Sequence, residues 1–97
     1  MITVRVYRKG SEVVVAAADK SLLGRCLRED KLRLDVCSSF YEGEDADEEM
    51  LVSRLQMATI ANLVGKETVE AAARNKLINE ECVMTIEGVP HVQMVKM

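Results

Sequence analysis

The residues that could carry chemistry in this sequence are few, and they do not form a known catalytic motif. His91 is the single histidine, and a nucleophile relay or a metal site would need partners placed around it. Cys26, Cys37 and Cys82 form no CxxC pair, so the spacing of zinc ligands is absent. The glycines are too scattered for a phosphate-binding loop. We therefore predict no catalytic residue, no metal and no cofactor, and a non-catalytic role is favoured over an enzyme.

A second group of residues suits contact with a ligand or partner, because binding residues concentrate at the ends of elements. Asn62 interrupts the apolar run 60–64, and a buried amide without hydrogen-bond partners costs about 1–3 kcal/mol. Either its amide and the His91 ring bond to nearby backbone, or they contact a ligand; both interpretations stay open. The candidate contacts are Phe40, Tyr41, Asn62, His91 and Gln93.

Charge is unevenly distributed along the chain, although the net charge is only −3. Residues 1–40 hold eight Lys/Arg and five Asp/Glu, whereas residues 41–50 hold six acids and no base. Arg5 and Tyr7 are predicted on the outer face of a first strand, with Lys31 and Arg33 on that of a third. If both strands lie in one sheet, these four residues form a basic surface for RNA phosphates or an acidic protein. The alternative that the sequence favours is an ordinary solvated face that carries Lys and Arg.

Hydrophobic periodicity in the first half of the chain predicts three strands and one short helix. Residues 2–6 alternate apolar and polar side chains, and residues 12–18 follow a Gly-Ser turn, so the two segments predict a β-hairpin. Asp19 is predicted to cap a short helix whose apolar residues lie between 23 and 27. Residues 31–36 alternate again and predict a third strand.

The second half predicts two longer helices and two strands. A loop over 38–45 leads to a helix that starts near Asp47, is apolar nearly all round from Met57 to Val64, and stops at Gly65. The remaining elements are a helix over 69–77 and strands over 83–86 and 91–95. The order is ββαβααββ. We expect one α+β domain over residues 1–97, with a mainly antiparallel sheet of about five strands and three helices mostly on one face.

Features that the sequence lacks predict the compartment in which the protein is found. No leader pattern precedes the first strand, and no apolar run approaches the roughly 20 residues of a membrane span. We therefore expect a cytoplasmic protein without a membrane partner. In that reducing compartment, each cysteine is expected to be a small buried apolar residue.

Four stretches together resemble an uncharacterised archaeal protein family, domain of unknown function four-two-four. They are residues 15–19 with 22–24, 32–36 with 39–43, 58–65, and 88–93. The resemblance implies a short, stand-alone archaeal protein, and it implies no activity, cofactor or catalytic residue. The matching positions that packing explains least are Phe40, Tyr41, Gly43, Asn62, Pro90, His91 and Gln93.

Three hypotheses for function follow from these observations. The first is a small non-catalytic accessory protein in archaeal RNA or translation metabolism, with RNA or an RNA-associated protein as its partner. The second is a ligand-binding protein or enzyme with a pocket near Tyr41, Asn62 and His91. The third is a protein–protein adaptor that uses the acidic segment. The oligomeric state stays open, since an exposed strand edge could support a homodimer.

Overall fold

A six-stranded mixed sheet is the centre of the computed structural model, which describes residues 1–96. Its strand order is β5-β1-β2-β6-β8-β7, and β3 and β4 form a separate two-stranded hairpin. The strands are β1 (Ile2–Lys9), β2 (Glu12–Asp19), β3 (Cys26–Glu29), β4 (Leu32–Asp35), β5 (Glu44–Ala46), β6 (Ile60–Val64), β7 (Met84–Ile86) and β8 (Val89–Val95). The helices are α1 (Ser38–Tyr41), α2 (Glu48–Met57) and α3 (Lys66–Arg74), with 3-10 turns at Lys20–Leu22 and Glu80–Cys82.

The α+β class with three helices is confirmed, although α1 lies in the segment 38–45 that was expected to be a loop. The sheet is antiparallel except between β2 and β6. The β1–β2 hairpin forms as its alternation predicts, and it turns at Gly10, whose φ of 60° suits glycine. The start of α2 also agrees, because the Asp47 side chain accepts a hydrogen bond from the Met50 backbone N–H. The two C-terminal strands pair with each other around a Glu87-Gly88 turn.

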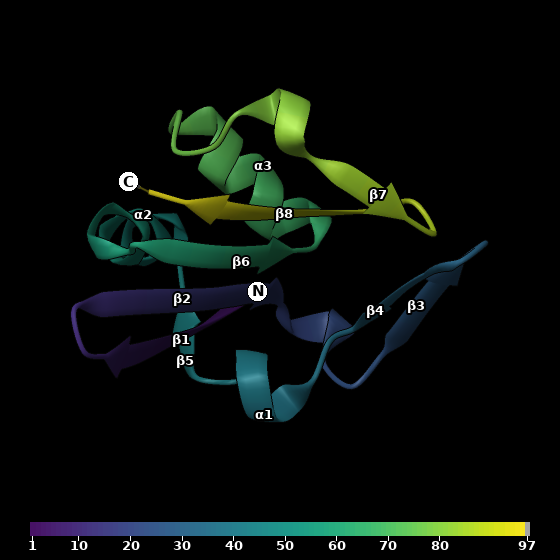
Figure 1. Ribbon diagram of the computed structural model, residues 1–97, viewed down its shortest axis with the longest axis horizontal. Coiled ribbons are helices and arrows are strands. Elements are labelled where there is room, and N and C mark those ends of the chain that lie inside the picture. Colours follow the sequence, from purple (N-terminus) through teal and green to yellow (C-terminus); the bar gives the residue numbers. More distant parts are fainter. Residues whose placement is uncertain (97) are drawn as a thin grey trace.

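The two faces of the six-stranded sheet are covered by different elements. On one face, alternate residues of β1, β2, β6 and β8 pack with α2 and α3 in an aliphatic core. On the other face, a smaller cluster joins β2 and β6 to α1 and to the β3–β4 hairpin. Figure 1 shows this hairpin projecting beyond the six strands. We call the first the helix-covered face and the second the hairpin-covered face.

Two predicted helical segments are strands in the structure. The apolar run at residues 60–64 was expected to continue the preceding helix, but α2 ends at Met57 and β6 begins at Ile60. β6 is paired on both sides, by β2 and β8, and it has buried residues on both faces, so its continuous apolar pattern is that of a central strand.

The second incorrect segment follows Asp19. A 3-10 turn and then β3 replace the expected short helix. Gly24 has a φ of 83°, its N–H bonds to the Val36 carbonyl, and the Val36 N–H bonds to the Arg25 carbonyl. This arrangement is a glycine β-bulge at the start of the β3–β4 hairpin. A helix cannot continue here, because it would need a right-handed backbone at Gly24. The additional strands β3, β5 and β6 raise the total from about five to eight.

The expectation that the three cysteines are buried is wrong. Cys26, Cys37 and Cys82 are all free and exposed. Cys26 begins β3, Cys37 follows β4, and Cys82 precedes β7. All three lie in segments that are exposed to solvent on one side. Among residues 1–96 there is no helix with the length and apolarity that crossing a membrane requires.

Candidate functional site

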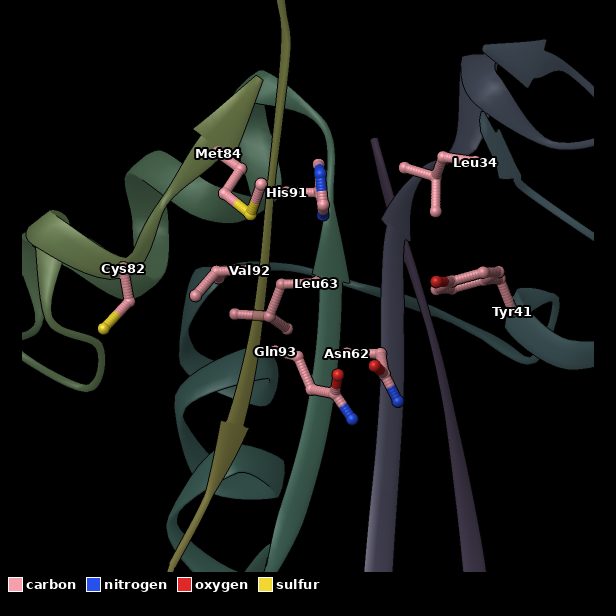
Figure 2. A pocket seen from close by; sticks show the side chains of 9 residues that line it. All are labelled: Leu34, Tyr41, Asn62, Leu63, Cys82, Met84, His91, Val92 and Gln93. Atoms are coloured by element: carbon pink, nitrogen blue, oxygen red, sulfur yellow. The ribbon is translucent and has the colours of Figure 1, made fainter. Parts of the chain in front are cut away.

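A groove of about 310 Å³ lies between the hairpin-covered face of the sheet and the elements above it. Its floor comes from β6, β7 and β8, and its wall comes from α1 and β4 (Figure 2). The residues that line it are Leu34, Tyr41, Asn62, Leu63, Cys82, Met84, His91, Val92 and Gln93. Four of the five predicted ligand contacts therefore come together at one cavity.

Strand register places the polar residues of the floor. Asn62 on β6 lies directly opposite Gln93 on β8, and their side chains lie next to each other in Figure 2. His91 is two residues before Gln93, so it shares the same face, and it pairs with Met84 on β7. Neighbouring strands are about 4.8 Å apart, so the two carboxamides and the imidazole are within reach of one small molecule.

The wall is held in place by hydrogen bonds between β1 and α1. The Tyr7 hydroxyl donates to the Phe40 carbonyl at 2.7 Å, and the Thr3 hydroxyl donates to the Tyr41 carbonyl at 3.4 Å. The Gly43 N–H then donates to the Thr3 hydroxyl at 2.9 Å. A Cβ at Gly43 would lie 2.2 Å from the Val4 carbonyl oxygen, so only glycine permits this close approach. The buried Tyr41 ring is thereby fixed with its hydroxyl toward β6 (Figure 2).

The far end of the hairpin is tied to the turn between β7 and β8. The Arg28 N–H donates to a Glu87 carboxylate oxygen at 2.7 Å, and the Glu87 N–H donates to the Glu29 carboxylate at 2.9 Å. The hairpin is thus anchored at α1 and at this turn. Leu34, between the two anchors, is held over the floor of the groove.

The groove carries no formal charge near neutral pH. Burial lowers the pKa of His91 below its usual 6.5, which favours the neutral imidazole. Burial also raises the pKa of Tyr41, with a further Coulombic contribution from Cys37, so the phenol stays protonated. No Asp, Glu, Lys or Arg is among the lining residues. The site therefore offers neutral hydrogen-bond donors and acceptors.

These polar groups have no partners within the part of the chain that the structure describes. Across residues 1–96 the His91 Nε2 atom is buried without a hydrogen bond. Over the same residues, the backbone of Tyr41 takes part in hydrogen bonds, but its hydroxyl and the side-chain amides of Asn62 and Gln93 do not. The backbone bond considered for Asn62 is therefore not found there. Residues 1–96 also contain no group of three His, Cys, Asp or Glu side chains arranged to hold a metal ion.

Phe40, the fifth predicted contact, lies outside the groove. Its ring stacks on Tyr7 with centroids 5.4 Å apart and meets Tyr41 edge-on at 4.9 Å. Phe40 thus supports the wall from behind and does not line the cavity.

The predicted basic residues lie in two different sheets. Arg5 and Tyr7 are on β1, whereas Arg33 is on β4 and Lys31 is in the turn before it. Arg5 donates to the Ser39 carbonyl at 2.8 Å and lies 5.0 Å from the centre of the Tyr7 ring. Arg33 pairs with Asp35 at 3.2 Å. The single sheet that the basic-surface hypothesis required is therefore not formed.

Sequence reasoning missed Leu34 and Met84, the apolar residues that flank the polar groups. Met84 alternates with Ile86 on a predicted strand, but nothing in that pattern shows that it pairs with His91. Cys82 was noted only for its thiol, and its sulfur points away from Tyr41 and Asn62 (Figure 2).

The fold and the groove define a class of small α+β protein: a mixed sheet with helices on one face and a short hairpin closing a neutral cavity on the other. The chain belongs to the family of proteins of unknown function DUF424, whose model matches residues 7–97. Among solved structures it is similar to an uncharacterized conserved protein from Methanopyrus kandleri, with a TM-score of 0.82 and 22% identity. The alignment covers 99% of this chain and 93% of that one, which shows a shared fold. No curated protein matches the chain.

Proposed function

We propose that this protein binds a small, uncharged, hydrogen-bonding molecule in the groove between β6, β8 and α1. The observation that carries the proposal is the convergence of Tyr41, Asn62, His91 and Gln93. These residues come from three separate segments, and within residues 1–96 their polar ends lack hydrogen bonds to protein.

Folding alone does not explain the unpaired Nε2 atom of His91. A buried polar atom without a partner costs about 1–3 kcal/mol, whereas an apolar side chain of similar shape would cost little. The His91 Nε2 atom is in this situation, and the half-buried Asn62 lies in a strand that is otherwise apolar. A ligand that supplied the missing donors and acceptors would offset that cost.

Binding is better supported than catalysis. Acid–base or nucleophilic chemistry needs a reactive group with an orienting partner close by. His91 is the only lining residue whose usual pKa is near neutral pH, and the Cys82 sulfur points away from the other polar groups (Figure 2).

The wider role that we propose is a part in archaeal RNA or translation metabolism, in the cytoplasm. The support for this role is the excess of basic residues over positions 1–40, which hold eight Lys/Arg and five Asp/Glu, because cationic side chains suit RNA phosphates. Three free cysteines among residues 1–96 fit a reducing compartment such as the cytoplasm. The similar protein from Methanopyrus kandleri supports an archaeal origin for the chain.

Nuclear magnetic resonance of the full chain tests the proposal directly. A library of uncharged fragments that carry hydrogen-bonding groups is screened, and hits are expected to shift the side-chain amide signals of Asn62 and Gln93. The variant Gln93→Met keeps the side-chain length but removes both hydrogen-bonding atoms, so it should weaken the hits. Gln56→Met makes the same change on exposed α2, outside the groove, and should leave them unchanged. A library without any hit at these signals would refute the proposal.

A further inference from the structure

We propose that the molecule recognised by this groove is a nucleobase, carried either by a free nucleoside or by single-stranded RNA. This inference rests on the proposed function, and it names the ligand class of the same site. Its basis is the pairing of two free carboxamides opposite an aromatic side chain, in a cavity without charge.

A carboxamide presents a hydrogen-bond donor and an acceptor side by side. The edges of nucleobases present the complementary pattern, which is why Asn and Gln bind adenine through two hydrogen bonds at once. Proteins read unpaired RNA bases in the same way, along the Watson–Crick and Hoogsteen edges. Asn62 and Gln93 are directly opposite each other on β6 and β8, so their Cβ atoms lie about 5 Å apart. Two such groups can contact successive atoms around one base.

The other lining residues suit a flat, largely apolar ring. The Tyr41 ring and the aliphatic side chains of Leu34 and Met84 line the same cavity. Leu34 and Tyr41 face Asn62 from the opposite wall (Figure 2). Aromatic rings and aliphatic groups cover the faces of a base while amides bind its edge. A volume of about 310 Å³ is at the lower end of the range for ligand sites, which fits one base and its sugar.

Phosphate must lie outside the groove. No cationic side chain lines it, and the neutral state of its polar groups gives nothing to balance a phosphate charge. A free sugar fits the groove less well than a nucleoside, because it has no flat ring for the Tyr41 side chain to cover.

The test is a chemical-shift titration of the full chain with five probes: adenosine, guanosine, cytidine, uridine and ribose, followed by a short single-stranded oligoribonucleotide. We expect at least one nucleoside or the oligoribonucleotide to shift the signals of Asn62, Gln93 and His91. Asn62→Leu should weaken that binding about tenfold, the loss of one bidentate contact. Gln93→Met should weaken it as well, and it keeps the test valid if Asn62→Leu fails to fold. Gln56→Met should have no effect.

The outcomes separate the ligand class from the proposed function. Nucleosides that bind at these signals support a free nucleoside as the source, and binding of the oligoribonucleotide alone supports RNA. Fragments that bind in the groove while nucleosides and oligoribonucleotide do not would overturn the inference and leave the proposed function standing. Ribose that binds as tightly as the nucleosides, or RNA binding unchanged by Asn62→Leu and Gln93→Met, would also overturn it. If no fragment binds either, both proposals fail.

Discussion

The two faces of the six-stranded sheet are built from the same strands, yet they are covered in different ways. On the helix-covered face, α2 and α3 lie over an aliphatic layer that includes Val15, Leu63 and Val92, all buried. On the hairpin-covered face, α1 and the hairpin shelter Ala18 and Val64 but leave Asn62 half-buried and Gln93 exposed. The polar groups occur where the cover stops. One face is thus covered throughout, whereas the other combines a small buried cluster with polar groups that stay open, as the proposed ligand site requires.

β6 displays this difference within two consecutive residues. Leu63 points into the helix-covered core and is 1% exposed, whereas Asn62 points to the groove. Substitutions at the two positions therefore test opposite sides of one strand.

The largest expected effect is on the helix-covered face. Leu63→Ala should lower the free energy of unfolding by about 2–5 kcal/mol, because it removes buried methyl groups and leaves a cavity. Asn62→Leu should change it by less than about 1 kcal/mol, since across residues 1–96 the side chain it removes makes no protein hydrogen bond. Urea denaturation of both variants measures the difference. Equal losses at the two positions would show that Asn62 is structural and that the contrast between the faces is wrong.

A second prediction compares how each face holds its helix. Asp19 caps α3: one carboxylate oxygen accepts from the Thr68 N–H and the Thr68 hydroxyl, both at 2.8 Å, and the other from the Glu67 N–H at 3.1 Å. Asp19→Ala should cost about 1–2 kcal/mol of stability, and Asp19→Asn, which keeps one acceptor oxygen, should cost less. On the hairpin-covered face, Tyr7→Phe removes the bond to Phe40 and should cost about 1 kcal/mol.

Denaturation midpoints of these three variants show which contact contributes more to stability: the cap of α3 by Asp19 or the hydrogen bond from Tyr7 to α1. A larger loss for Tyr7→Phe than for Asp19→Ala would reverse the ranking. It would mean that α1 and the wall of the groove contribute more to stability than the cap of α3 does.

The cap also shows what sequence reasoning could reach in the fold. Asp19 was expected to cap the helix that follows it in sequence, but it caps α3, forty-eight or more residues later. Gly65 makes this possible, because its φ is 109° and a Cβ there would lie 2.3 Å from the Asp19 Cγ. The local pattern correctly predicted that Asp19 caps a helix, but the predicted helix stop at Gly65 is wrong, because Gly65 lies between β6 and the start of α3. Which helix Asp19 caps depends on the parallel pairing of β2 with β6, which no local pattern encodes.

The same limit explains the strand at residues 60–64. A short apolar run can be a buried strand or the end of a buried helix, and periodicity alone does not separate them. The β-branched ends Ile60 and Val64, and the short length, were the available signals for a strand. At the site, Tyr41, Asn62, His91 and Gln93 could be grouped from sequence because packing did not explain their polar ends. Leu34 and Met84 could not, since apolar residues at strand positions are explained by any core.

The smallest expected effect is the contribution of the partly buried His91 to the pH dependence of stability. Burial lowers the native pKa below the usual 6.5, so as the pH falls below about 6.5 the unfolded chain gains a proton that the native protein resists. Stability from this residue is thus fully present above that pH and is lost as the pH falls toward the native pKa. His91→Gln should remove this part of the decline when denaturation midpoints are compared between about pH 5 and 8. His91 is the only histidine, so its proton resonance can be titrated directly in the native protein. A native pKa at or above 6.5 would mean that the imidazole is solvated. The hairpin-covered face would then hold no desolvated polar atom at His91, and its groove would not differ from an ordinary solvent-exposed surface.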